Sequence, residues 1–86
     1  MAKYKPPIPI KKRDLLKILR RHGCEIHPEM GAGSHWGMTR QLPSGRVLSY
    51  SVADHREYEH DYINPIRRAM ELSKDDGVTT RQFYEV

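Results

Sequence analysis

The six residues Gly31-Ala32-Gly33-Ser34-His35-Trp36 divide the chain into two parts of different character. Small, turn-forming residues precede a histidine, and an alternation of apolar and polar residues begins directly after it. The segment therefore predicts a loop that places His35 at the start of a β-strand. Before this loop the pattern indicates a helix and one strand, and after it the pattern indicates a hairpin and closing helices.

The part before the loop begins with a basic helix. Residues 11–22 carry an apolar stripe at helical spacing, and His22 continues that stripe as a packing residue. Gly23 stands where helices commonly end in a left-handed residue. Residues 24–30 then alternate, which indicates a strand, and Pro28 restricts it to a sheet edge or a strand end.

The part after the loop begins with a hairpin. Residues 35–42 alternate apolar and polar, residues 46–52 are rich in strand-forming types, and Pro-Ser-Gly at 43–45 supplies the turn. Alternation puts Trp36 on the opposite side of its strand from His35. Trp36 could stack on an unpaired base, but this placement favours a role in the core.

The remaining residues predict two helices. Residues 53–63 have no clear pattern and are expected to be irregular. Asn64 and Pro65 suit the N-cap and first turn of a helix that ends near Ser73. Thr79 and Gln82 fit a capping box at the start of a short terminal helix.

This order of elements favours an α+β fold, with a three-stranded antiparallel sheet, helices on one face and a short C-terminal helix. Pro6, Pro7 and Pro9 indicate an extended, mobile arm over residues 1–10. A single domain is expected over residues 11–86.

The composition is that of a small globular domain, with 86 residues, 37% of them hydrophobic and 30% charged. A chain of this length buries about 60–65% of the surface that its unfolded form exposes. No apolar run approaches the roughly 20 residues that a membrane span needs, and no apolar segment of a secretory signal follows the basic start. Cys24 is the one cysteine, so we expect a buried thiol in a reducing, cytoplasmic compartment.

Positive charge is concentrated at the beginning of the chain. The net charge is +4 and the pI is about 9.4, and eight of the 15 Lys and Arg residues fall within residues 1–21. Such clustering indicates a polyanionic partner, usually a nucleic acid. A solvated helix face and an acidic protein partner are the alternatives. The candidate RNA-binding side chains on the predicted helix are Lys12, Arg13, Lys17, Arg20 and Arg21.

His35 could act as a general base. A histidine has an unperturbed pKa of about 6.5, so it can take the proton of a ribose 2′-hydroxyl and let that oxygen attack the adjacent phosphorus. Gly33 would allow close approach of a phosphate backbone, and Ser34 could contact phosphate oxygens. From these residues alone, an ordinary turn followed by an exposed, inactive histidine is the favoured interpretation.

Residues 12–24, Lys-Arg-Asp-Leu-Leu-Lys-Ile-Leu-Arg-Arg-His-Gly-Cys, followed by Gly33-Ser34-His35, resemble the HicA (YcfA-like) toxin family. The resemblance covers roughly residues 11–85. It implies a double-stranded-RNA-binding-domain-like α-β-β-β-α fold, mRNA endoribonuclease activity and a HicB-like antitoxin partner. It also implies that His35 is the catalytic histidine and that His55 is a second histidine near the end of the third strand.

Three functions fit these observations. The first is a metal-independent mRNA endoribonuclease, with His35 as general acid/base and His55 or Ser34 as a second acid–base group or phosphate contact. The second is a noncatalytic RNA-binding module of the same fold, and the third is a small protein-interaction domain. The expected partners are mRNA and a HicB-like antitoxin, and we expect no metal, no small-molecule cofactor and no membrane.

Overall fold

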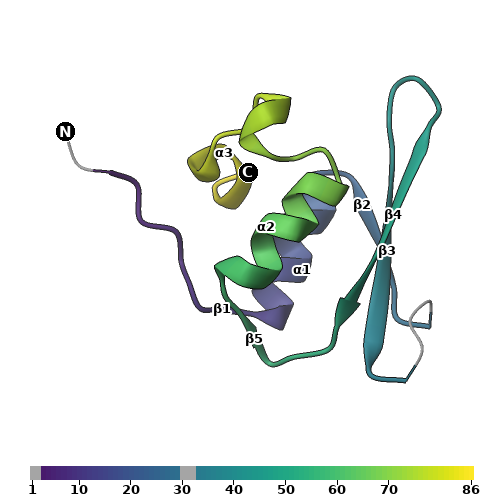
Figure 1. Ribbon diagram of the computed structural model, residues 1–86, viewed down its shortest axis with the longest axis horizontal. Coiled ribbons are helices and arrows are strands. Elements are labelled where there is room, and N and C mark those ends of the chain that lie inside the picture. Colours follow the sequence, from purple (N-terminus) through teal and green to yellow (C-terminus); the bar gives the residue numbers. More distant parts are fainter. Residues whose placement is uncertain (1–2, 30–32) are drawn as a thin grey trace.

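A three-stranded antiparallel sheet carries helices on one of its faces (Figure 1). This is the architecture of the computed structural model, which describes residues 3–29 and 33–86. The strands are β2 (Cys24–His27), β3 (His35–Gln41) and β4 (Val47–Ala53), in that order across the sheet. The predicted α+β fold with this sheet is therefore confirmed. The loop residues Met30, Gly31 and Ala32 lie outside the described residues.

The basic helix forms where its apolar stripe predicts it. Helix α1 (Lys12–Arg21) buries Leu15, Ile18 and Leu19 against the core. Gly23 follows with a φ of 86°, which is the left-handed conformation expected after a helix. His22 is a packing residue, as predicted.

The imidazole of His22 joins the first helix to the last. Its ring stacks on Phe83 with centroids 5.2 Å apart, and its Nε2 lies 2.8 Å from the Phe83 carbonyl oxygen. Phe83 belongs to α3 (Thr80–Tyr84), whose predicted capping box is present: the Gln82 amide donates to Thr79 Oγ1 and the Thr79 amide donates to Gln82 Oε1.

The predicted hairpin forms with its predicted turn at residues 43–45. Met38 lies opposite Tyr50, and Leu42 N donates to Arg46 O at 2.8 Å, which leaves three residues in the turn. Gly45 adopts a φ of 92° there, a conformation that side chains disfavour. The strand β2 lies at the sheet edge and ends before Pro28, as that proline requires.

The prediction for residues 53–63 and the following helix is wrong in its boundaries. A short strand, β5 (Glu57–Tyr58), precedes helix α2 (His60–Ala69), so the N-cap is Glu59 and Pro65 lies inside the helix. Burial of Ile63 together with Ile66 outweighs the local Asn-Pro signal. Pro65 is the sixth residue of α2, so the helix lacks the hydrogen bond that an N–H at this position would donate to the Asp61 carbonyl.

Helix α2 also ends earlier than predicted. Met70 is its C-cap, and Glu71 follows in a left-handed conformation with a φ of 53°. The chain then forms a 3-10 turn, η1 (Lys74–Asp76), before α3. Within the two described ranges, no helix has the length and apolar character needed to cross a bilayer.

The proline-rich segment is extended, as expected, but its last residues belong to the core. Ile10 is 4% exposed and begins β1 (Ile10–Lys11), which pairs antiparallel with β5 so that Ile10 lies opposite Tyr58. Tyr4 and Ile8 also pack against the core. Residues of the N-terminal segment before the predicted boundary at residue 11 therefore belong to the domain.

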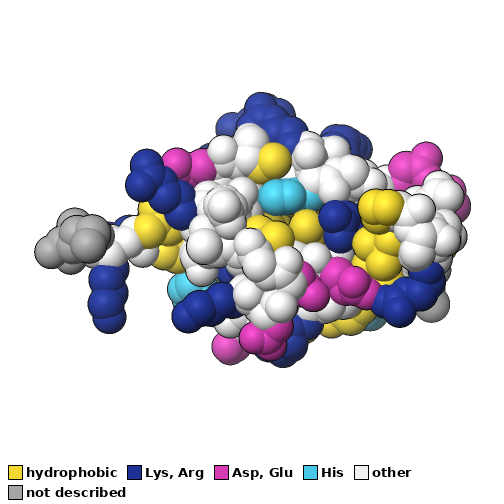
Figure 2. Space-filling view, turned by 90° about the horizontal axis from the view of Figure 1, so that it is seen from above, with side chains coloured by type: hydrophobic (Ala, Val, Ile, Leu, Met, Phe, Trp, Pro, Cys, Tyr) yellow, Lys and Arg dark blue, Asp and Glu magenta, His cyan; other side chains and the backbone are white. Residues whose placement is uncertain are grey.

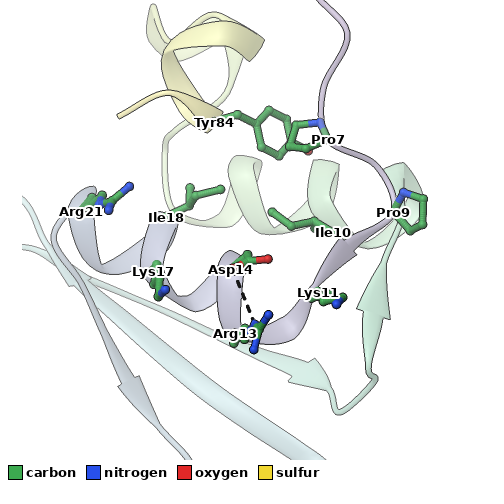
Figure 3. Close-up of a pocket in the computed structure, with 10 residues that line it drawn as sticks. All are labelled: Pro7, Pro9, Ile10, Lys11, Arg13, Asp14, Lys17, Ile18, Arg21 and Tyr84. Carbon is green, nitrogen blue, oxygen red and sulfur yellow. Dashed lines mark ion pairs between the residues drawn. The ribbon is translucent and has the colours of Figure 1, made fainter.

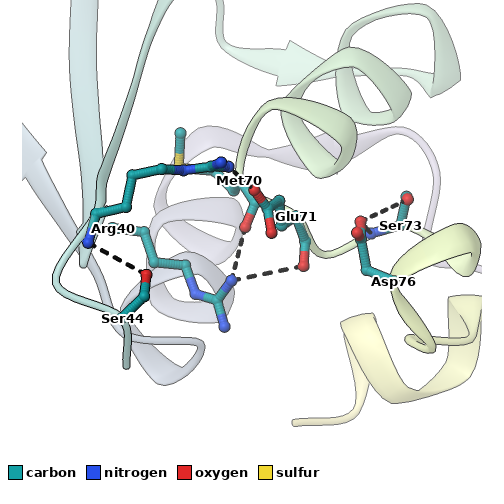
Figure 4. A network of polar contacts seen from close by, with 7 residues as sticks. Arg40, Ser44, Met70, Glu71, Ser73 and Asp76 are labelled. Atoms are coloured by element: carbon teal, nitrogen blue, oxygen red, sulfur yellow. Dashed lines mark hydrogen bonds and ion pairs between the residues drawn. The ribbon is translucent and has the colours of Figure 1, made fainter. Parts of the chain in front are cut away.

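Two arginines brace the helices against the rest of the fold. Arg40 of β3 reaches the C-terminal end of α2, where its Nη1 donates to Met70 O at 2.7 Å (Figure 4). The Nε of Arg40 donates to His22 O at the end of α1. Arg67 of α2 is buried over the Phe83 ring and donates to the carbonyl oxygens of Leu72 and Val78. A positive charge at a helix C-terminus also complements the helix dipole.

Candidate functional site

His35 is the first residue of β3 and lies opposite Ala53 of β4. Its side chain is exposed, and no described side chain or backbone group forms a hydrogen bond with its ring. The next residue, Trp36, is 3% exposed and donates from its indole nitrogen to the Tyr58 hydroxyl at 3.0 Å. Alternation along the strand therefore separates the two side chains as predicted: Trp36 enters the core and His35 faces outward.

The backbone around His35 is held on both sides. Gly33 has a φ of 64°, and the Asp54 amide donates to the Ser34 carbonyl oxygen at 2.7 Å. The Asp54 carboxylate lies 2.7 Å from Lys12 Nζ at the start of α1. The start of β3, the end of β4 and the beginning of α1 therefore meet at this end of the sheet.

His55 follows the same end of β4 and is part of an aromatic cluster. Its Nε2 lies 3.1 Å from the Tyr62 hydroxyl, and its ring packs edge-on against Tyr58 and Tyr62. The His55 backbone amide donates to the buried Tyr58 hydroxyl at 2.9 Å, and that hydroxyl donates to Ala53 O at 2.7 Å. Tyr58 thus fixes the segment that joins β4 to β5.

An open groove of about 650 Å³ lies beside His55. Most of its lining side chains are basic or titratable, and they come from β1, α1 and the segment after β4: Lys11, Lys12, Arg13, Asp54, His55, Arg56 and Glu57. His35 does not line this groove, and no described hydrogen bond connects the rings of His35 and His55. The two predicted histidines therefore share one end of the sheet without forming a contacting pair.

The predicted basic face of α1 is divided between two surfaces. Arg13, Lys17 and Arg21 recur every fourth residue and line a second groove under the proline-rich segment, on the side of Pro7 and Tyr84 (Figure 3). Lys12 lies in the groove beside His55, and Lys11 and Arg13 line both grooves, so the two grooves adjoin. On the face seen in Figure 2, Lys and Arg side chains are spread among acidic ones. On this face, therefore, the basic side chains do not form one continuous patch.

Sequence reasoning missed three contributors to this region. Lys11 and Arg56 line the groove because β1 pairs with β5, a long-range contact that no local pattern indicates. The Tyr58 hydroxyl holds both Trp36 and the His55 backbone. His55, Tyr58 and Tyr62 lie in a loop, in β5 and in α2, so their clustering depends on the fold and no local spacing indicates it.

Two buried titratable groups lie away from these histidines. Burial raises the pKa of the Cys24 thiol to about 11, and the nearby Arg40 only partly offsets that effect. Burial also raises the pKa of Tyr84 to about 12. Both groups are therefore protonated at neutral pH, and neither is an activated nucleophile.

No cluster of three or more His, Cys, Asp or Glu side chains with metal-binding geometry occurs in residues 3–29 and 33–86. Comparison with protein-family models, with curated proteins and with solved structures finds no match to this chain.

Proposed function

We propose that this chain is a metal-independent mRNA endoribonuclease of the HicA toxin type, with His35 as the general acid/base. The finer fold in the proposal is the α-β-β-β-α arrangement of double-stranded-RNA-binding domains. The observation that supports it is the exposed His35 ring between two fixed neighbours, Trp36 in the core and Ser34 bound to Asp54. A catalytic base must be reachable by substrate and held in place.

The chemistry requires only proton transfers and basic side chains. The neutral His35 imidazole accepts the proton of a ribose 2′-hydroxyl, and the 2′-oxygen forms a bond to the adjacent phosphorus. The bond from phosphorus to the 5′-oxygen breaks, and that oxygen takes a proton from a second acid, His55 or water. The products are a 2′,3′-cyclic phosphate and a 5′-hydroxyl. Lys12 and Arg56 would attract the phosphate backbone toward this end of the sheet.

The decisive test compares His35→Ala with His60→Ala. Both histidines are exposed, but His60 begins α2 and has no proposed role. Expression of the wild-type chain and of His60→Ala should arrest growth and degrade mRNA, whereas His35→Ala should do neither. Equal toxicity of all three proteins would exclude His35 as the catalyst. EDTA should leave cleavage unchanged, and inhibition by EDTA would refute the metal-independent mechanism.

The proposed protein partner is a HicB-like antitoxin. Its coexpression should restore growth in cells that express the wild-type chain, and the two proteins should copurify. Failure of every HicB-like protein encoded beside the gene to bind the chain would contradict this part of the proposal.

A noncatalytic RNA-binding module is the second candidate function. The observation that favours it is the basic groove beside His55, which His35 does not line. In this case wild type and His35→Ala would bind RNA with the same strong salt dependence, and neither would cleave it. Substitution of Lys12 should reduce the salt slope, and substitution of Arg20, which lines neither groove, should leave it less affected.

A further inference from the structure

The strand β4 forms a long and unprotected edge of the sheet. Its seven residues, Val-Leu-Ser-Tyr-Ser-Val-Ala, include no charge, proline or glycine, and no described strand pairs with its outer side. Natural edge strands are usually kept short, charged or interrupted, because free backbone groups recruit other strands. The opposite edge, β2, has these protections: it is four residues long, it contains Glu25, and Pro28 follows it.

The hydrogen bonds at the ends of the hairpin show which backbone groups are free. Leu42 N donates to Arg46 O, and Asp54 N donates to Ser34 O, in the same register as the pair Met38 and Tyr50. Residues of an antiparallel pair alternate between bonding to the neighbour and pointing away from it. The even-numbered residues of β4 therefore bond to β3. The outward N–H and C=O groups belong to Val47, Ser49, Ser51 and Ala53, and of these the Ala53 carbonyl oxygen already accepts from the Tyr58 hydroxyl at 2.7 Å.

We propose that β4 pairs antiparallel with β4 of a second copy of this chain, with Tyr50 on the two-fold axis. In this register Val47 lies opposite Ala53 of the second copy, and Ser49 lies opposite Ser51. Each outward residue then meets an outward residue, so both copies pair the free edge groups of Val47, Ser49 and Ser51 and the Ala53 amide. The Ala53 carbonyl oxygen has two lone pairs and would accept from the Val47 amide of the second copy in addition to the Tyr58 hydroxyl. The two sheets join into one continuous sheet, which is an isologous interface.

Charge complementarity at the ends of the strand supports this register. Centring the pair on Tyr50 places Arg46 of one copy opposite Asp54 of the other, at both ends of the interface. The two side chains are 65% and 49% exposed, which leaves them room for a second partner. Within one copy, Arg46 pairs with Glu71 and Asp54 pairs with Lys12, so the contact between copies extends two existing ion pairs. Opposite charges facing each other across paired strands stabilise the pairing.

The apolar side chains fit the same arrangement. Leu48 and Tyr50 pack at the margin of the core and are only partly buried, and Val47 is 59% exposed. Tyr50 would form a non-hydrogen-bonded pair with its own copy, in which Cα atoms lie about 4.5 Å apart and side chains are closest. Leu48 would lie opposite Val52. Dimerisation would therefore cover the partly exposed side chains of Leu48 and Tyr50 at the edge of the core.

The first experiment measures the mass of the full chain by light scattering and sedimentation, from low to several hundred micromolar. The wild type should have twice the 10.1 kDa monomer mass at the upper end. Ser49→Pro removes an outward N–H that β3 does not use, and Tyr50→Lys places two like charges on the axis, so both variants should be monomers. Circular dichroism verifies that each is folded. A monomeric wild type, or folded variants that remain dimers, would overturn the proposal.

The second experiment tests the register by crosslinking in a Cys24→Ala background. Only a residue on the two-fold axis lies opposite itself, and a disulfide requires Cα atoms about 4.4–6.8 Å apart. Mild oxidation should therefore link Tyr50→Cys to itself and should leave Ser49→Cys and Ser51→Cys, each alone, unlinked. A mixture of the two serine variants should crosslink. Equal self-linking at all three positions would refute the register.

A charge exchange gives an independent test. Arg46→Asp or Asp54→Arg alone puts like charges opposite each other and should weaken the dimer several-fold, whereas the double variant should restore it. No recovery in the double variant would contradict the pairing of these two residues.

Discussion

The Tyr58 hydroxyl holds both candidate histidines in place: His35 through its neighbour Trp36, and His55 through its backbone amide. The Tyr58 side chain is fully buried, and its oxygen accepts from Trp36 Nε1 at 3.0 Å and from the His55 amide at 2.9 Å while donating to Ala53 O at 2.7 Å. Tyr58→Phe keeps the ring and its packing and removes only this oxygen. Three groups then lose their hydrogen-bond partner.

The expected cost follows from the burial of those three groups. A net hydrogen bond contributes about 0.5–1.5 kcal/mol, and a buried group left without a partner costs about 1–3 kcal/mol. The Trp36 indole is 3% exposed and cannot reach water, whereas His55 is exposed, so water can replace part of the loss there. We therefore expect Tyr58→Phe to lower the free energy of unfolding by about 2–4 kcal/mol. The melting temperature should fall by about 10–25 °C for a domain of this size.

Urea unfolding followed by tryptophan fluorescence is a direct assay, because the chain has one tryptophan and its indole touches the missing oxygen. Tyr62→Phe is the matched control: its ring is 43% exposed, and its hydroxyl contacts the exposed His55 ring at 3.1 Å. That control should change stability by less than about 0.5 kcal/mol. If both variants lower the free energy of unfolding by the same amount, the Tyr58 hydroxyl does not hold Trp36 and the His55 backbone in place.

Three further predictions concern other buried or capped groups. Arg67→Met removes the donor to the carbonyl oxygens of Leu72 and Val78 and should lower the free energy of unfolding in urea by about 3–5 kcal/mol. A decrease below about 1 kcal/mol would contradict the role of Arg67 in holding these segments together. The pKa of Cys24, about 11 in the folded chain, lies above its unfolded value, so the free energy of unfolding should decrease as pH rises from about 9 to 11. The Cys24 thiol should also resist Ellman's reagent until urea is added, and rapid labelling of the folded chain would refute its burial. Hydrogen bonds from the Ser73 hydroxyl and amide lower the pKa of Asp76. Their contribution to stability is therefore present above the ordinary aspartate pKa of about 3.9 and is lost as pH falls through the pKa of the folded state. Thermal melts across the acid range should show a smaller loss of stability for Asp76→Asn than for the wild type, and an identical loss would exclude a contribution from Asp76.

Sequence patterns predicted the elements whose signals are local. The stripe of α1, the hairpin turn and the capping box at Thr79 each depend on residues within a few positions of one another, and all three are confirmed. The start of α2 was not predictable in this way. Its N-cap signal at Asn64 competes with burial of Ile63, and burial depends on the rest of the fold.

In the candidate site, too, local patterns predicted some features and missed those that depend on the rest of the fold. Strand alternation alone predicted that Trp36 is buried and His35 exposed, and both are confirmed. The distribution of the basic residues was not predicted, because it depends on which surface each side of α1 meets. The groove beside His55 requires Lys11 and Arg56 to be brought together by β1 and β5, far apart in the sequence.

The pairing of β1 with β5 has a consequence for how the groove opens. The β1–β5 pair is a ribbon with only two residues in each strand, and next to it Lys12 N donates to Arg56 O at 2.9 Å. Separation of this ribbon would expose the buried side chains of Ile10 and Tyr58, so opening is a rare fluctuation. The groove beside His55 would then exist only in the closed population, and an anion bound across it would add its binding energy to closure. Hydrogen exchange at the Lys12 amide should therefore slow when RNA is present, and its exchange rate would report occupancy of the groove.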